Sequence, residues 1–176
     1  EVAPLNLPNY DDWVLREALH NCVAHQDYTQ GGRILVTEGP DTLRFFNYGE
    51  FLPGSLDKVL HAQQPEQRYR NACLADAMVE LDLMETLNRG VKGMFRKQKE
   101  RFFPLPDFDI EVQPASVSVL LYGRVLDKGY VDALMTNSDL TLEDAVLLDQ
   151  IQKGRKPPAG ELRRLRAKGL VEGRSP

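Results

Sequence analysis

The chain has 176 residues, of which 42% are hydrophobic and 27% are charged, and its formal net charge is −4. This is the composition of an ordinary soluble globular protein, and the length predicts one domain plus a small appendage. The 22 Lys and Arg residues are outnumbered by 26 Asp and Glu residues. This balance excludes a surface coated throughout by nucleic acid or anionic membrane, so any such contact must be local.

Two cysteines, Cys22 and Cys73, stand among apolar neighbours in a chain of this size, which excludes a disulfide scaffold or a zinc ribbon. We therefore expect a reducing, cytoplasmic setting. No apolar run approaches the ~20 residues that cross a bilayer, and no signal-peptide pattern opens the chain, so no membrane partner is expected. The start at Glu1 without an initiator Met suggests a fragment of a longer protein.

The first predicted element is a helix that begins at Asp11 or Asp12, because an aspartate caps well and apolar residues follow at helical spacing. These residues are Leu15, Ala18, Leu19, Cys22 and Val23. Two β-rich runs, 33–38 and 42–48, flank the turn Gly39-Pro40-Asp41 and predict an antiparallel hairpin. The segment 49–62 is predicted to be a loop.

Further along, helical spacing predicts a second helix over about 67–87 that stops near Gly90, and then a short basic helix over about 91–101. Two more strands, 109–113 and 116–122, are expected around a bend at Pro114. The order of helices and hairpins predicts an α+β fold, a two-layer α/β sandwich over residues 1–122.

From Gly123 the strand signals vanish, and residues 123–176 are expected to form a small helical, winged-helix-like domain. Thr141 and Asp144 form a capping-box pattern at the start of one helix. A second helix is expected over 159–168, followed by a wing strand at Gly169-Leu170-Val171.

The tail from residue 151 onward carries eight positive against two negative residues, a net of +6. We expect its last helix to bind DNA, as a recognition helix that contacts phosphates and reads one or two bases. The predicted DNA-binding residues are Arg163, Arg164, Arg166 and Lys168. The alternative is a basic amphipathic helix whose charges are only solvated. Because one such module seldom binds tightly alone, a homodimer or a further domain is expected.

On the first helix, Glu17, Asn21 and His25 recur at i, i+4 and i+8 and share one side. The Asn oxygen can ligate a hydrated Mg²⁺ while the carboxylate orients or deprotonates a water, which makes Glu17 the catalytic candidate and Asn21 the metal ligand. Asp27 follows just beyond the helix end. The alternative is a solvated polar face with incidental spacing.

The segment Arg89-Gly90-Val91-Lys92-Gly93 lies between two predicted helices. Glycines let backbone N–H groups approach a phosphate, the helix dipole favours an anion, and Arg89 and Lys92 add positive charge. An ordinary helix C-cap followed by a surface helix remains the alternative.

Residues 45–54 end a strand in Asn47 and continue into a glycine loop rich in aromatic residues. A nucleobase can bind at such a place, with Asn47 on its edge and Gly49 allowing close approach. The alternative is a hairpin core with a structural turn. His20 and His61 have no Cys or His at ligand spacing, so no zinc site is expected.

Residues 16–28, REALHNCVAHQDY, resemble the R-E-A-x-x-N-x-x-x-H-x-D-Y signature of the RecG-related ATP-binding regulators. Further matches follow in order at Asn47-Tyr48-Gly49, Leu52-Pro53-Gly54, Arg70-Asn71 and 83–93, so the resemblance covers about residues 10–113. The family is similar to the GHKL nucleotide-binding fold, and its members usually carry an AlbA/Schlafen-type DNA-binding domain upstream.

The resemblance implies bound ATP and Mg²⁺, with Glu17 as the general base, Asn21 as the Mg²⁺ ligand and the Gly90–Gly93 loop around the phosphates. We also expect His25 and Asp27 to contact the nucleotide. The D-x-G-x-G box of GHKL proteins is absent, and Asn47-Tyr48-Gly49 stands as its substitute. The first hypothesis is therefore a nucleotide-responsive transcriptional regulator. If it is an enzyme, we expect a weak ATPase. The alternatives are a GHKL scaffold for dimerisation without nucleotide and, third, an accessory part of an ATP-dependent DNA helicase.

Overall fold

The computed structural model describes residues 9–63, 68–84 and 90–171. Within them the chain forms a four-stranded antiparallel sheet and seven α-helices, so the predicted α+β class is confirmed. No helix of the described part is long and apolar enough to cross a membrane.

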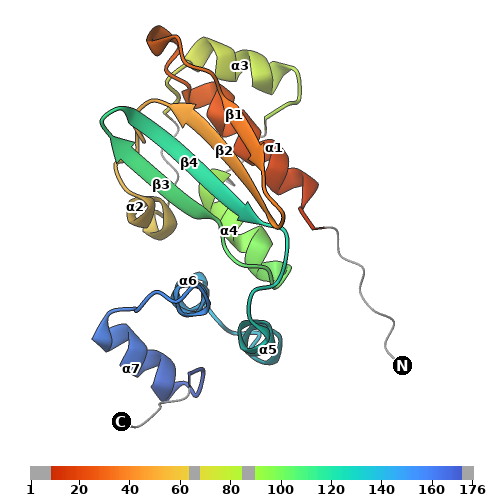
Figure 1. The fold of residues 1–176 in the computed structure, drawn as a ribbon, viewed down its shortest axis with the longest axis vertical. Helices are drawn as coiled ribbons and strands as arrows, with labels where there is room; N and C mark the ends of the chain where they lie inside the picture. Colours follow the sequence, from red (N-terminus) through yellow and green to blue (C-terminus); the bar gives the residue numbers. More distant parts are fainter. Residues whose placement is uncertain (1–8, 64–67, 85–89, 172–176) are drawn as a thin grey trace.

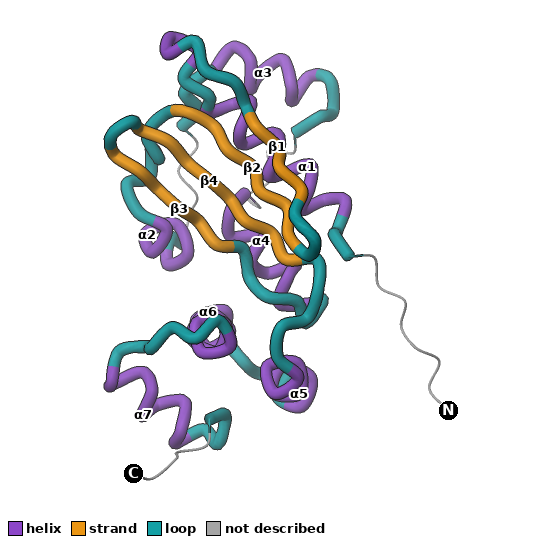
Figure 2. Tube along the Cα trace, viewed as in Figure 1, coloured by secondary structure: helices purple, strands orange, loops and turns teal. Residues whose placement is uncertain are grey.

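The sheet consists of two hairpins placed side by side (Figures 1 and 2). Its strands are β1 (Leu35–Glu38), β2 (Thr42–Tyr48), β3 (Asp107–Val112) and β4 (Ala115–Tyr122), in the order β1-β2-β4-β3. Both predicted hairpins are therefore present, with bounds within about two residues. Val119 lies opposite Phe45 on one side and Phe108 on the other, so one face of the sheet is apolar.

Helices α1 (Asp12–His25) and α4 (Gly90–Glu100) cover that apolar face (Figure 1). The Asp11 side chain accepts hydrogen bonds from the backbone N–H groups of Trp13 and Val14, which fixes where α1 begins. The core between the helices and the sheet is made by Val14, Ala18, Cys22, Phe45, Met94, Val117, Val119 and Leu121.

Helix α4 has a second buried side, and the C-terminal helices pack on it. Met94 is buried toward the sheet, while its neighbour Phe95 belongs to a separate core with α5 (Lys128–Thr136), α6 (Leu142–Gln152) and α7 (Ala159–Ala167). This second core includes Leu105, Tyr130, Leu134, Ala145, Leu148 and Leu165. The segment after Gly123 therefore shares apolar packing with the sheet domain.

A buried ionic network also joins α6 to the sheet. Lys153, whose side chain is 4% exposed, lies 2.6 Å from Asp149 and 3.1 Å from Asp107. Tyr122 and Arg155 donate hydrogen bonds of 2.6 and 2.8 Å to Asp107. Burial raises the pKa of Asp149, whereas at Asp107 burial is outweighed by these hydrogen bonds and by Lys153, which lower its pKa.

Two predictions between the hairpins need correction. The segment 49–62 is not all loop, because Ser55 caps a short helix, α2 (Leu56–His61). The helix predicted over 67–87 is shorter: α3 runs Ala72–Glu80, and the described chain then turns through Asp82 at φ 55°. This turn returns Met84 to the core made by Ala24, Ala75 and Met78, a long-range contact that no local pattern shows.

In the C-terminal part, Thr141 and Asp144 form the predicted capping box at the start of α6. The expected strand at Gly169-Leu170-Val171 is wrong, because these residues form a turn and a bend after α7. Leu170 instead packs against the core around Leu165, and its N–H donates to the Leu165 carbonyl. The segment is thus used to end the helix.

Candidate functional site

Glu17, Asn21 and His25 lie in one row along α1, as their spacing predicts. The Asn21 side-chain N–H₂ donates to the Glu17 carboxylate at 2.9 Å and to the Glu17 backbone carbonyl at 2.8 Å. Because the amide nitrogen is turned toward Glu17, the carboxamide oxygen is the atom that Asn21 can offer to a cation. The row extends over about 12 Å, at 1.5 Å of rise per residue.

The start of α4 faces the Glu17 end of this row. A Cβ atom added to Gly90 would lie 3.8 Å from Glu17 Oε1, so the carboxylate and the glycine are close neighbours. Gly90 begins α4 with φ 30°, and Lys92 and Gly93 lie in its first turn. Arg89 lies outside the described residues.

The His25 end of the row is more enclosed. The His25 ring lies 5.6 Å from the ring of Tyr69, centroid to centroid. Burial, together with the charge of Arg70, lowers the pKa of His25 to about 4 from an ordinary value of 6.5. The imidazole is therefore neutral at physiological pH, so any contact with a nucleotide would be made by a neutral hydrogen-bonding group.

Asn47 and Gly49 lie at the end of β2, close to the His25 end of the row. Asn47 is buried on the same face of the strand as Phe45, and its N–H₂ donates to the Tyr48 carbonyl at 3.1 Å. Gly49 has φ 122°, and an added Cβ would lie 2.9 Å from both the His25 carbonyl and Arg70 Nε. Gly49 is therefore required by the packing of the protein itself, whatever binds beside it.

The structure adds residues that motif spacing did not single out as functional. Gln26, only 1% exposed, donates to the Gly32 carbonyl and accepts the N–H of Tyr48, both at 3.0 Å. Asn71 donates to the carbonyls of Ala24 and Gln26. These two amides join the end of α1 to β2 and α3. Their only sequence signal is that Gln26 lies within the motif of residues 16–28 and Asn71 within Arg70-Asn71.

Asp27, also predicted to bind nucleotide, has a local structural role. Its carboxylate accepts hydrogen bonds from Thr29 and Gln30 and caps the 3₁₀ turn Tyr28–Gln30. The same hydrogen bonds lower the pKa of Asp27. It therefore fixes the chain that leaves α1.

The donor set on α1 suits a Mg²⁺ ion that arrives with a nucleotide. Mg²⁺ prefers one or two protein oxygens completed by water and phosphate. Glu17 provides a carboxylate beside Gly90, and Asn21 provides a carboxamide oxygen one turn further along α1. The described residues contain no group of three or more His, Cys, Asp or Glu side chains that could hold a metal. Glu17 and Asn21 suit a cation that completes its ligand shell with water or phosphate.

The four cations predicted to bind DNA are not equivalent. Lys168 lies 2.8 Å from Asp144, which is fully buried, and Arg164 lies 3.0 Å from Glu161 and 3.5 Å from Asp144. Arg163 and Arg166 are exposed, and neither makes an ion pair within the described part of the chain. Half of the predicted patch is thus already neutralised by carboxylates.

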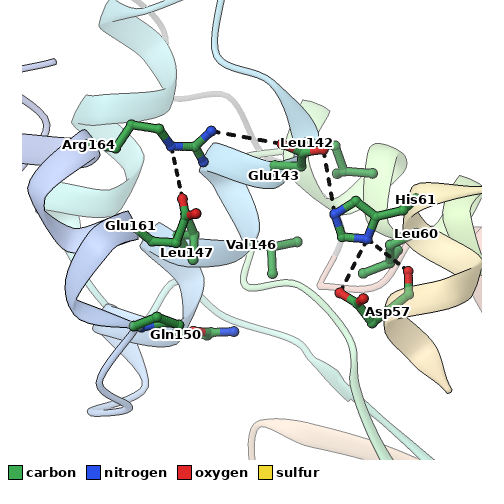
Figure 3. Close-up of a pocket in the computed structure, with 11 residues that line it drawn as sticks. Asp57, Leu60, His61, Leu142, Glu143, Val146, Leu147, Gln150, Glu161 and Arg164 are labelled. Atoms are coloured by element: carbon green, nitrogen blue, oxygen red, sulfur yellow. Dashed lines mark hydrogen bonds and ion pairs between the residues drawn. The ribbon is translucent and has the colours of Figure 1, made fainter.

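A pocket of about 320 Å³ lies between α2, α6 and α7 (Figure 3). Apolar side chains line its interior, including Leu60, Val146 and Leu147, and charged side chains surround it. His61 of α2 and Arg164 of α7 approach the same residue of α6, Glu143 (Figure 3). The pocket is separate from the row on α1 and shares no lining residue with it.

Comparison with solved structures finds the DIP2311 protein from Corynebacterium diphtheriae, with a TM-score of 0.60 and 21% sequence identity. The match covers 96% of this chain and 35% of that one, so the chain spans about a third of that protein's length. At this identity the likeness shows the fold alone. No curated protein matches the chain.

A family model does match, over residues 31–121, and its description is "Putative ATP-dependent DNA helicase recG C-terminal". The matched part includes the sheet, Asn47, Gly49 and the start of α4, whereas α1 with Glu17 and Asn21 lies before it. Because the match covers more than half of the chain, the protein belongs to this family of RecG C-terminal, ATPase-like domains.

Proposed function

We propose that this protein binds ATP with Mg²⁺ between α1 and the start of α4, and that it does so as part of a transcriptional regulator. The observation that carries the proposal is the position of the Glu17 carboxylate, which accepts a hydrogen bond from Asn21 and lies beside Gly90. A carboxylate, a carboxamide and the first turn of a helix together suit a Mg²⁺–phosphate group.

Each residue has a specific role in the proposed complex. The backbone N–H groups at Gly90 and Gly93 bind phosphate oxygens, Lys92 adds a positive charge, and Asn21 ligates the cation through its carboxamide oxygen. Glu17 orients a water for a slow hydrolysis reaction. Mg²⁺, when bound, supplies charge neutralisation of the phosphates.

The second part of the proposal is that α7 binds DNA. Arg163 and Arg166 are exposed on one helix, which suits contacts to the phosphate backbone. Two such cations provide little affinity by themselves, so the proposed form on DNA is a homodimer or a longer chain with another DNA-binding domain.

Isothermal titration of ATP with MgCl₂ into the chain tests the nucleotide site. Wild type is expected to bind with a micromolar dissociation constant, and Asn21→Ala to bind at least roughly tenfold more weakly, the factor given by the loss of about 1.4 kcal/mol. His20→Ala is the matched control, since its side chain is rotated by about 100° from Asn21 on the same helix. Equal binding by Asn21→Ala and wild type would contradict the proposed site.

The second candidate function is a scaffold for dimerisation that binds no nucleotide. It is favoured by Arg70, whose side chain fills the space beside Gly49 where a base was expected to approach. Absence of any ATP binding to folded wild type, together with a dimer in sedimentation equilibrium, would support this candidate.

A further inference from the structure

Lys92 makes a contact within the protein itself. Its ammonium group donates a hydrogen bond of 3.0 Å to the backbone carbonyl of Ala62, the residue that ends α2. Carbonyls at a helix C-terminus have no partner within the helix, and a cation there stabilises them. Lys92 therefore holds the end of α2 against the start of α4.

The other end of this contact leads to the C-terminal helices. His61 precedes Ala62, and its Nε2 lies 3.5 Å from the Glu143 carboxylate of α6. The second oxygen of Glu143 lies 3.9 Å from the guanidinium of Arg164 on α7 (Figure 3). A continuous series of contacts thus joins the first turn of α4 to the basic helix.

We infer that α2 is a switch element in which a phosphate competes with the Ala62 carbonyl for Lys92, and the release of α2 changes the contacts of Glu143 with α7. The inference rests on the proposed nucleotide site and names the regulation of that same site. It requires no new residue, because every contact in the series is present in the structure.

The relative strengths of the two possible hydrogen bonds of Lys92 favour the phosphate over the Ala62 carbonyl. A hydrogen bond from an ammonium group to a phosphate oxygen joins two charged groups and is stronger than one to a neutral carbonyl. Once Lys92 turns to a phosphate, the six-residue α2 loses a partner at its C-terminus, and short helices depend on such tertiary contacts. Glu143 then loses His61 and is left with Arg164 as its partner.

Hydrogen–deuterium exchange of the full chain, with and without a non-hydrolysable ATP analogue and MgCl₂, tests the switch. In wild type, the nucleotide is expected to speed exchange of the amides of 57–62 by roughly tenfold, the factor for one lost hydrogen bond. Exchange in α7 is expected to change as well. In His61→Ala, α2 still responds and α7 does not.

Asp57→Asn is the matched control, because Asp57 contacts His61 within α2, at 3.2 Å, and does not bridge to α6. This variant is expected to keep the α7 response. If α7 responds equally in His61→Ala and wild type, or if bound nucleotide leaves the exchange of α2 unchanged, the inference is wrong.

A measurement without nucleotide separates the switch from the proposed function. Lys92→Met removes the ammonium group and keeps much of the side-chain volume, so it is expected to speed α2 exchange in the nucleotide-free protein. Unchanged exchange in this variant overturns the switch even if ATP binds. If wild type does not bind ATP, the proposed function is wrong. The switch is then also wrong as a response to nucleotide, whatever Lys92→Met shows.

Discussion

The row on α1 and the basic helix α7 are both polar surfaces, but the structure uses their charges differently. On α1, Asn21 donates a hydrogen bond to Glu17, and the Glu17 carboxylate faces the glycine that begins α4. On α7, Arg164 and Lys168 are paired with carboxylates, among them the fully buried Asp144. A basic run in a sequence therefore does not tell which of its cations can meet a ligand.

The largest expected effect tests whether α6 is part of the sheet domain. Lys153→Met leaves Asp107 and Asp149 buried without their ammonium partner, so unfolding free energy should fall by about 3–5 kcal/mol. Urea denaturation followed by circular dichroism measures this change. The exposed Lys156→Met is the control, with an effect within about 0.5 kcal/mol. If Lys153→Met leaves the unfolding transition of the sheet unchanged, the sheet and the C-terminal helices unfold separately.

The next effect concerns the glycine beside the α1 row. Gly49→Ala should cost about 2–3 kcal/mol, because φ is 122° and the new Cβ would meet the His25 carbonyl at 2.9 Å. Gly54→Ala has a positive φ, 83°, but no atom within 4 Å of its Cβ. This control should cost only about 1 kcal/mol. Equal losses in thermal denaturation would show that the close contact contributes nothing.

A third prediction uses the neutral His25. Its pKa falls from 6.5 in an ordinary environment to about 4 in the fold, so the folded state resists protonation. Stability contributed by neutral His25 is therefore present above pH 6.5 and is lost as pH falls toward 4. Wild type should lose about 2 kcal/mol more than His25→Gln over this window. Denaturant titrations at pH 7 and 4.5 measure the difference, and parallel losses would refute the assignment.

The smallest effect separates the cations of α7. Arg166→Gln should weaken binding to duplex DNA and lower the slope of log affinity against log salt by about 1, with stability unchanged. Lys168→Gln should instead cost about 1–2 kcal/mol of stability, because it removes a partner of the buried Asp144. Fluorescence anisotropy and thermal denaturation check both. If Lys168→Gln weakens DNA binding and leaves stability unchanged, Lys168 leaves Asp144 to bind DNA.

Local chemistry made part of the fold predictable. The cap at Asp11, the capping box at Thr141 and the hairpin around Pro40 all depend on neighbours within a few residues, and each predicted element is present. The two incorrect predictions between the hairpins, a loop over 49–62 and a helix over 67–87, share a different cause. Met84 after α3 returns to a core that includes Ala24 of α1, and α2 is held by Lys92, which lies 30 residues away from Ala62.

For the candidate site, the sequence determined the row on α1, because a helix repeats every 3.6 residues and fixes which side chains share a side. Only the tertiary structure decided what the row faces and which charges of the tail pair with the buried Asp144. Those outcomes depend on contacts between α1 and α4 and between α6 and α7, which are separated by loops whose path no local spacing determines. Pairing and burial, and not composition, therefore select the residues of this protein that can meet a ligand.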